Sequence, residues 1–314
     1  MTKLCITDRE LPAKYYNKLM AKMTFDNRDG WIWQNGNFVP WRDAKMHVIS
    51  QGLHYANCVF EGERAYNGKI FKSIEHTNRL FNSAKILGIP IPFTKEEINL
   101  AKDSLIKKMN YKNCYVRAIA WRGGEAMGLS TKDNITNVAI AVWNDWATYF
   151  KKEDRLKGLR LITSPWKRPS PDSSPWNAKA SGLYTICTMS KSFAEEKGYN
   201  DSLMLDHRGY VAEGTGANIF FVEKDTIHTP IADCFLNGIT RQEVITIANQ
   251  KKINVLERHI KPEELKNFSE AFLTGTAAEI TSISEIDKIK YTTGHNTLTN
   301  QLMDAFTELV NSLN

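Results

Sequence analysis

Apolar and polar residues alternate in short runs near the start of the chain, and Asn-Gly interrupts two of these runs. Asn35-Gly36 lies within segment 31–39, and Asn67-Gly68 lies within segment 64–71. Because Asn-Gly readily adopts the positive φ angles of a type I′ turn, both segments predict β-hairpins.

The pattern then changes to a period close to 3.6 residues, which is typical of amphipathic helices. One helix is expected at 73–88, where Gly88 ends the pattern. A second begins with Thr94 and Glu97, whose spacing is that of a capping box. Strands expected at 114–121 and 137–143 would complete a unit of mixed helix and sheet.

A proline-rich stretch at 165–175 is too apolar for a plain linker and predicts an ordered loop or a lid. The elements expected beyond it are a helix at 184–197, paired strands at 202–213 and 218–222, a helix capped by Thr240 and Glu243, and a last helix that carries Leu298, Leu302, Phe306 and Leu309. We therefore expect an α+β protein of two domains.

The expected domain boundaries follow from these elements. Residues 1–29 form a polar N-terminal extension, and residues 30–144 form a smaller α+β domain. A polar and aromatic connection at 145–157 leads to a larger domain at 158–314.

Composition narrows the class of protein. With 42% hydrophobic and 24% charged residues among 314, the chain is neither collagen-like nor wholly disordered. The net charge of +6 is spread without a basic block, and no apolar run has the length of a membrane span, so we expect neither nucleic-acid nor membrane binding. Five scattered cysteines without a C-x-x-C pair predict reduced thiols and a cytoplasmic location.

Common catalytic signatures are missing from the sequence. It has no G-x-S-x-G elbow, no H-E-x-x-H zinc motif and no Walker loop. Gly214-Thr215-Gly216 begins like a dinucleotide-binding motif, but Ile219 occupies the place of its third glycine. We therefore expect neither a metal site nor a nicotinamide cofactor.

Three remaining segments suggest a different chemistry. Lys179 lies among small residues, in the kind of cramped surroundings that lower the pKa of a Schiff-base lysine. Glu213 precedes glycines that allow a planar group to approach, and a carboxylate beside a pyridine nitrogen keeps that nitrogen protonated. Segment 238–241 opens a helix and could cradle a phosphate. Taken singly, these features also fit a surface lysine, a β-bulge and a simple helix cap.

Together, the segments resemble the branched-chain amino-acid aminotransferases, fold-type IV enzymes that use pyridoxal 5′-phosphate. The matching motifs, in the family's order, are Leu53-His54-Tyr55, Val59-Phe60-Glu61-Gly62, Arg79-Leu80, Tyr115-Val116-Arg117, Ala178-Lys179-Ala180, Glu213-Gly214-Thr215-Gly216-Ala217-Asn218, Gly238-Ile239-Thr240-Arg241 and Gly275-Thr276-Ala277-Ala278-Glu279-Ile280. The resemblance implies two domains, the larger with a barrel-like sheet, and a cofactor in the cleft between them.

The resemblance also implies the roles of the cofactor-binding residues. Lys179 would hold pyridoxal 5′-phosphate covalently and act as acid and base during proton transfer. Glu213 would pair with the pyridinium nitrogen, and Tyr184 would hydrogen-bond the ring hydroxyl. The phosphate would be held by Arg79, Ile239, Thr240 and Thr276.

The substrate side is implied in the same way. The α-carboxylate would meet Tyr115 and the amides of Thr276 and Ala277, and Arg117 would help to recognise the second carboxylate of glutamate, with Tyr55 and Arg64 nearby. The apolar pocket would be lined by Phe60, Leu129, Trp146 and Tyr149. In the family, part of this pocket comes from the partner subunit, so Tyr55 and Leu129 would act across a homodimer or an assembly of dimers.

The implied reaction is transamination between leucine, isoleucine or valine and 2-oxoglutarate, which gives branched-chain 2-oxo acids and L-glutamate. D-amino-acid aminotransferases and 4-amino-4-deoxychorismate lyases of the same fold are the alternatives. Some positions depart from the commonest family pattern, among them Ser181, Leu183, Ala217 and the acidic Glu63, which stands where an apolar residue is common.

Overall fold

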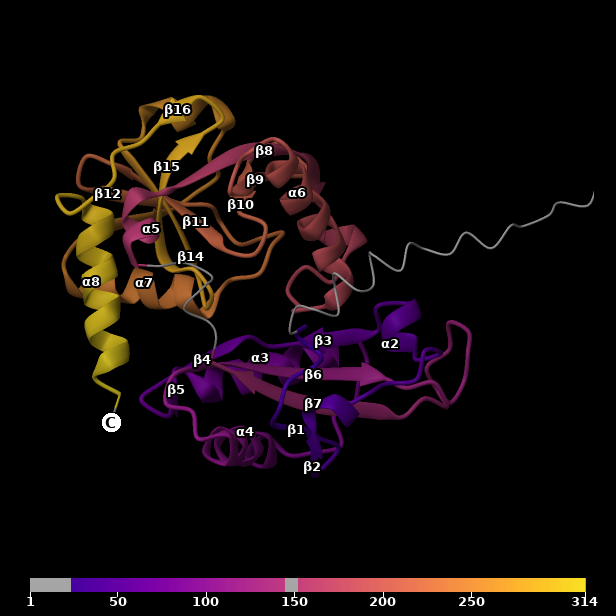
Figure 1. The fold of residues 1–314 in the computed structure, drawn as a ribbon. Coiled ribbons are helices and arrows are strands. Elements are labelled where there is room, and N and C mark those ends of the chain that lie inside the picture. The colour runs from indigo at the N-terminus through magenta and orange to yellow at the C-terminus, as the bar shows by residue number, and fades with distance from the viewer. Residues whose placement is uncertain (1–23, 145–151, 314) are drawn as a thin grey trace, which may run out of the picture.

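The computed structural model describes residues 24–144 and 152–313, which form two sheets stacked one above the other in Figure 1. The first sheet has the strand order β2-β1-β7-β6-β4-β5, with β3 also paired to β6. Its strands are β1 (Trp31–Gln34), β2 (Asn37–Pro40), β3 (Cys58–Phe60), β4 (Glu63–Tyr66), β5 (Lys69–Ile70), β6 (Cys114–Arg122) and β7 (Thr136–Trp143).

Both predicted Asn-Gly hairpins are confirmed. Asn35 and Gly36 have φ angles of 48° and 91°, and Asn67 and Gly68 have 50° and 83°. The turns join β1 to β2 and β4 to β5 in antiparallel register. The local preference of Asn-Gly for positive φ is therefore sufficient to place these two turns.

Two helices pack on one face of the first sheet. They are α3 (Ser73–Ile86) and α4 (Lys95–Met109), and their apolar sides meet alternate residues of β6 and β7 in one core. The predicted capping box of α4 is confirmed, because the Thr94 hydroxyl accepts from the Glu97 amide and the Glu97 carboxylate accepts from the Thr94 amide. The 3-10 turn η1 (Trp41–Asp43) and the short helix α2 (Gln51–His54) connect the strands.

The second sheet closes into a ring of six strands, β10-β9-β8-β15-β14-β11, as the barrel-like prediction required. Its members are β8 (Leu159–Arg168), β9 (Asp201–Asp206), β10 (Val211–Glu213), β11 (Asn218–Glu223), β14 (Glu270–Gly275) and β15 (Glu279–Ile286), while β12 (Thr226–Thr229), β13 (Asn254–Glu257) and β16 (Ile289–Lys290) extend it. The ring closes between β10 and β11 through one residue pair, Glu213 and Asn218.

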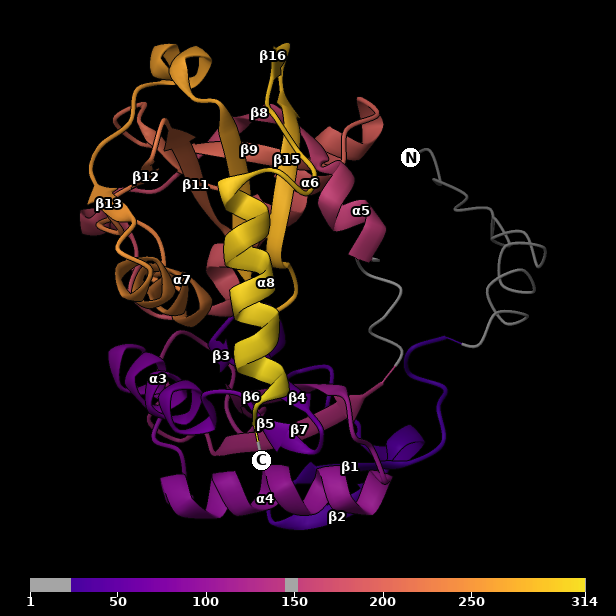
Figure 2. The ribbon, with the colours of Figure 1, turned by 90° about the vertical axis from the view of Figure 1, so that its left-hand side faces the viewer.

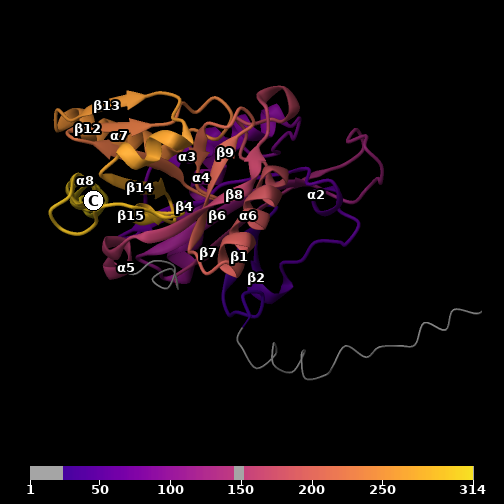
Figure 3. The same ribbon diagram turned by 90° about the horizontal axis from the view of Figure 1, so that it is seen from above.

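Helices cover the outside of this ring. They are α5 (Lys152–Lys157), α6 (Thr185–Glu196), α7 (Ile239–Gln250) and α8 (Leu298–Asn311). Three 3-10 turns lie in the connections of this part of the chain, η3 (Pro171–Ser173), η4 (Ser181–Tyr184) and η5 (Pro262–Asn267). In Figure 2, α8 runs down the second sheet toward the first. Figure 3 shows α8 and α2 at opposite ends of the molecule. None of the described helices has the length and apolarity needed to cross a lipid bilayer.

Two local predictions are wrong. Thr240 and Glu243 do not cap α7, since the N-cap is Gly238, which offers no side chain, and both residues lie inside the helix. The expected strand at 202–213 is broken into β9 and β10 by a turn, because Asp206 Oδ1 accepts the amides of Arg208 and Tyr210. In both places a backbone amide donates to a side chain, that of Gly238 to Asn218 and those of Arg208 and Tyr210 to Asp206, and the apolar pattern does not indicate these contacts.

Candidate active site

A cavity of about 110 Å³ lies between the two sheets and is lined from both of them. The first sheet and its helices contribute Gly62, Arg79 and Tyr115. The second contributes Arg168, Lys179, Tyr184, Glu213, Asn218, Gly238, Ile239, Thr240, Thr274, Thr276 and Ala277, among others. Most of the residues singled out from the sequence therefore meet in one place, although they are far apart in the chain.

Lys179 is held where the two sheets touch. Its carbonyl accepts from the Phe60 amide at 3.1 Å, and its own amide donates to Ser83 Oγ at 2.9 Å. The side chain enters the cavity, where Nζ donates to the Tyr184 hydroxyl at 2.6 Å. Burial, assisted by the nearby Arg79 cation, lowers the pKa of Lys179 to about 8. The amine is thus partly neutral near physiological pH, as a nucleophile or base requires.

Glu213 supplies a carboxylate to another wall of the cavity. Burial raises the pKa of Glu213 to about 7, and the Arg168 guanidinium opposes this rise. Arg168 Nε lies 3.3 Å from Glu213 Oε1, and Asn218 Nδ2 donates to Oε2 at 3.3 Å. This carboxylate can therefore exchange a proton with a bound base near neutral pH.

The N-terminus of α7 opens into the same cavity. Gly238 gives the first amides of the helix no side-chain cap, and a Cβ at this position would lie 2.3 Å from Asn218 Oδ1. Thr240 and Ile239 line the cavity beside this end of the helix, and Thr276 lines it from the β14–β15 turn. The buried Thr274 hydroxyl has no hydrogen-bond partner among the described residues. Exposed helix amides and hydroxyls form a site suited to an anion.

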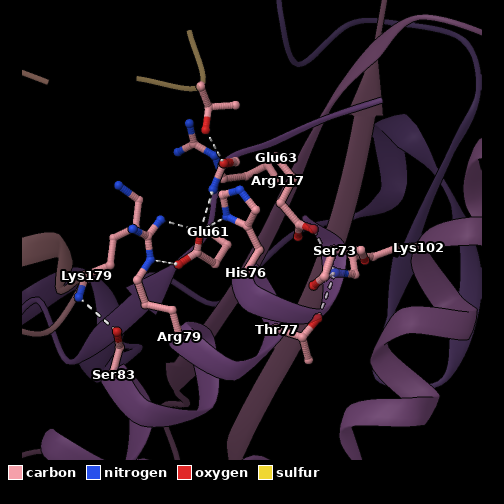
Figure 4. Close-up of polar contacts among 12 residues, drawn as sticks. Glu61, Glu63, Ser73, His76, Thr77, Arg79, Ser83, Lys102, Arg117 and Lys179 are labelled. Atoms are coloured by element: carbon pink, nitrogen blue, oxygen red, sulfur yellow. Dashed lines mark hydrogen bonds and ion pairs between the residues drawn. The ribbon is translucent and has the colours of Figure 1, made fainter. Parts of the chain in front are cut away.

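Arg79 brings a positive charge to this anion site, and its guanidinium is held by the buried Glu61 carboxylate (Figure 4). It donates through Nε to Glu61 Oε1 at 2.7 Å and through Nη2 to Oε2 at 2.9 Å. Glu61 is fully buried, and His76 Nδ1 lies 2.7 Å from its Oε2. Arg79 and His76 hold the pKa of Glu61 well below its usual range, against the effect of burial. The two-point contact sets the orientation of the guanidinium.

Aromatic and basic side chains gather where the cavity meets the first sheet, and of these Tyr115 lines the cavity whereas Phe60 and Arg117 lie beside it. The Tyr115 hydroxyl accepts from Arg117 Nη2 at 3.0 Å. The centres of the Phe60 and Tyr184 rings are 4.8 Å apart. The Arg117 guanidinium lies 4.7 Å from the centre of the Phe60 ring. Gly62 is required here because a Cβ would lie 1.9 Å from the Tyr115 hydroxyl. Phe60 is also close to the catalytic candidate, because its ring centre lies 4.9 Å from Lys179 Nζ.

The other residues predicted for the substrate side are distributed differently. Arg64 does not line the cavity, since its Nη1 is bound 2.5 Å from Glu279 Oε1. Tyr55 and Leu129 are 45% and 85% exposed and lie outside the cavity of this chain. Trp146 and Tyr149 lie outside the described residues.

Three residues of the site had no role assigned from the sequence. Glu61 and Asn218 belong to family motifs, Val59-Phe60-Glu61-Gly62 and Glu213-Gly214-Thr215-Gly216-Ala217-Asn218, and this membership was the signal that could have found them. Arg168, at the end of β8, has no comparable signal, because it comes near Glu213 of β10 only when β8 and β10 pair with β9 between them.

The set of groups in the cavity fits a ligand with a carbonyl, a basic ring nitrogen and a phosphate. Lys179 offers a neutral amine for the carbonyl, Glu213 a carboxylate for the ring nitrogen, and the α7 N-terminus with Arg79 a cradle for the phosphate. Pyridoxal 5′-phosphate has these three groups.

Comparison with known proteins gives a consistent result. The amino-transferase class IV family model matches residues 58–286. A probable branched-chain-amino-acid aminotransferase of Rickettsia felis is 44% identical over 256 residues, which cover 82% of this chain and 87% of the relative. The branched-chain-amino-acid aminotransferase of Pseudomonas aeruginosa is 39% identical over 293 residues, covering 92% and 95%.

Solved structures agree with these relatives. The branched-chain amino acid aminotransferase of Escherichia coli superposes with a TM-score of 0.86 at 35% identity, covering 90% of this chain and 95% of its own. The T.th. branched-chain amino acid aminotransferase complexed with N-(5′-phosphopyridoxyl)-L-glutamate gives 0.85 at 38% identity, covering 91% and 96%.

Proposed function

This chain belongs to the amino-transferase class IV family, and from that premise we propose that it transfers the amino group of L-leucine, L-isoleucine or L-valine to 2-oxoglutarate, giving branched-chain 2-oxo acids and L-glutamate. The observation that carries the proposal is Lys179, an amine of lowered pKa facing a carboxylate and an anion cradle across one cavity. Relatives and solved neighbours named as branched-chain enzymes support the substrate class.

Pyridoxal 5′-phosphate, when bound, supplies the carbonyl that takes the amino group and an electron-withdrawing ring. Glu213 pairs with the ring nitrogen, Arg168 and Asn218 orient that carboxylate, and Tyr184 donates to the ring hydroxyl. Arg79, Ile239, Thr240 and Thr276 hold the phosphate. This division of labour is supported by the position of each residue on the cavity wall.

Lys179 is the catalytic residue of the reaction. Its amine would hold the cofactor covalently and, when free, would act as the base that takes the proton from the substrate Cα and then, as the resulting ammonium, as the acid that gives that proton back. The hydroxyl of Tyr184, 2.6 Å from Lys179 Nζ, keeps the free amine in the cavity. The lowered pKa leaves a fraction of the amine unprotonated at neutral pH.

The substrate lies between Tyr115 and the β14–β15 turn. Tyr115 and the amides of Thr276 and Ala277 bind the α-carboxylate, which fixes the Cα proton toward Lys179. Phe60 provides an apolar surface for a branched side chain, and Arg117 provides a charge for the second carboxylate of glutamate. We also assign Trp146 and Tyr149 to this pocket, with Arg64 nearby, and we expect Tyr55 and Leu129 to reach it from a partner chain.

A panel of amino donors tests the function. With 2-oxoglutarate as acceptor, L-leucine, L-isoleucine and L-valine should each give L-glutamate, and D-alanine should give no product. Turnover of D-alanine alone would favour a D-amino-acid aminotransferase, and release of pyruvate from 4-amino-4-deoxychorismate would favour the lyase. Lys179→Ala should lose the near-visible absorption band of the bound cofactor and all turnover.

Assembly, location and domain limits are further parts of the proposal. We expect a homodimer or an assembly of dimers, supported by the exposure of Tyr55 and Leu129. Sedimentation at the mass of one chain would contradict it.

A cytoplasmic location and domains at 30–144 and 158–314, joined at 145–157 and preceded by 1–29, remain predictions. The domain limits are supported by the first sheet using strands up to Trp143 and the second using strands from Leu159.

A further inference from the structure

Glu279 stands directly after the turn proposed to bind the α-carboxylate, and its backbone is strained. It is the first residue of β15 and pairs with Gly275 across the β14–β15 hairpin. Its φ angle is +47°, in the left-handed region where glycine or asparagine is usual. A glutamate at this position therefore needs an explanation from its side chain.

The Glu279 carboxylate crosses from the second sheet to the first. Oε1 accepts from the Tyr66 hydroxyl at 2.8 Å and lies 2.5 Å from Arg64 Nη1, and both partners belong to β4. Oε2 pairs with Arg155 of α5. Glu279 is only 7% exposed, so these contacts are largely shielded from water.

The same turn is tied to the first sheet at a second point. Thr276 Oγ1 donates to the Gly62 carbonyl at 2.9 Å, just before β4 begins. Thr276, which makes this second contact, and Ala277, which lies between it and Glu279 in the chain, both line the cavity. The turn is thus held against β4 and the residue before it, and Thr276 and Ala277 face the place where a substrate would bind.

We propose that Glu279 is a positioning residue for substrate recognition: by fixing the turn at 276–278 against Arg64 and Tyr66, it holds the turn amides in the orientation that receives a substrate carboxylate. The inference rests on the proposed function for the role of the turn. It also gives Arg64 a function other than direct substrate contact, because its guanidinium is bound to Glu279. The left-handed backbone is tolerated because the carboxylate makes these three contacts.

Two variants separate positioning from simple stability. Glu279→Gln keeps the size of the side chain and removes its charge, whereas Glu279→Gly removes the side chain and relieves the backbone strain, so the fold is retained. The matched control is Glu285→Gln. Glu285 lies on the same strand, is also buried, and also pairs with two cations, Arg160 and Lys290, but these do not belong to β4.

The first measurement needs no substrate or inhibitor. Hydrogen exchange of the amides at 276–278 should become about tenfold faster in both Glu279 variants of the holoenzyme, and should not change in Glu285→Gln. Unchanged exchange in the Glu279 variants would overturn the proposal, as would an equal acceleration in the control.

The second measurement is calorimetric binding of 4-methylvalerate, an apolar carboxylate, to the holoenzyme. The dissociation constant should rise about tenfold in both Glu279 variants, and the KM for L-leucine should rise with it while kcat changes less. Unchanged affinity would overturn the positioning role, and a wild-type protein that fails to bind 4-methylvalerate would overturn the assignment of the turn to a carboxylate. Wild-type binding without turnover of branched-chain donors would instead refute the proposed function and leave the role of Glu279 standing.

Discussion

Replacing Lys179 with methionine should stabilise the cofactor-free protein at neutral pH, although it abolishes activity. The ordinary pKa of a lysine is 10.5, and burial lowers that of Lys179 to about 8. Between these values the unfolded chain binds more protons than the folded one, so the stability of the wild type rises with pH across this window. Below it, the folded protein carries the full cost of a buried ammonium.

The size of the effect follows from the two pKa values. The gap between about 8 and 10.5 corresponds to roughly 3 kcal/mol of destabilisation at pH 7 and roughly 1.5 kcal/mol at pH 9.5. The Lys179→Met variant also lacks the 2.6 Å hydrogen bond from Lys179 to Tyr184. This lowers its free energy of unfolding by about 1 kcal/mol, by a similar amount at both pH values. The variant should therefore be more stable by about 2 kcal/mol at pH 7, with little difference left at pH 9.5.

Urea denaturation of the cofactor-free proteins at pH 7 and 9.5 measures both quantities. Lys107→Met is the matched control, since Lys107 is exposed on α4 and its substitution should give the same small change at the two pH values. A wild type more stable than Lys179→Met at pH 7, or a difference that does not shrink by pH 9.5, would refute the reasoning.

Three further predictions concern other parts of the structure. Because burial raises the pKa of Glu213 from 4.5 to about 7, the folded protein binds more protons than the unfolded chain between these values, so the cofactor-free wild type should lose stability from about pH 4.5 to 7, and Glu213→Gln should remove that dependence in urea denaturation. Glu61→Gln should lower the preference for pyridoxal phosphate over pyridoxal about tenfold in equilibrium dialysis, because Arg79 loses its charged two-point support. Glu63→Gln, which loses an equally buried carboxylate paired with a lysine away from the cavity, should leave that preference unchanged. Thr94→Ala should cost about 1 kcal/mol in urea denaturation and leave the kinetics unaffected.

The parts of the fold that could be predicted are those decided by neighbouring residues. Asn35-Gly36 and Asn67-Gly68 form turns because their own φ preferences favour them. Thr94 and Glu97 cap α4 because each reaches the amide of the other. The apolar spacing of the last helix likewise places α8, whose buried face includes Leu302 and Phe306.

What could not be predicted depends on contacts between distant segments. Nothing near Glu279 in the sequence indicates Arg64 or Tyr66, which are more than 200 positions away. Gly238 replaces Thr240 as the N-cap of α7 because its amide donates to the Asn218 side chain at 3.1 Å, a contact set by the packing of β11. The family motifs indicated which residues gather in the cavity, but their orientation depends on these long-range partners.

The six-stranded ring closes through the single pair Glu213 and Asn218, and this pair also faces the cavity. The carboxylate proposed to tune the cofactor is therefore part of the seam that makes the barrel continuous. Enzyme engineers who vary positions 213 and 218 will alter barrel closure and ring chemistry together, so libraries at this seam should be selected for folding before activity. Variation at Phe60 or Arg117, which lie beside the cavity on strands of the other sheet, leaves barrel closure unaffected.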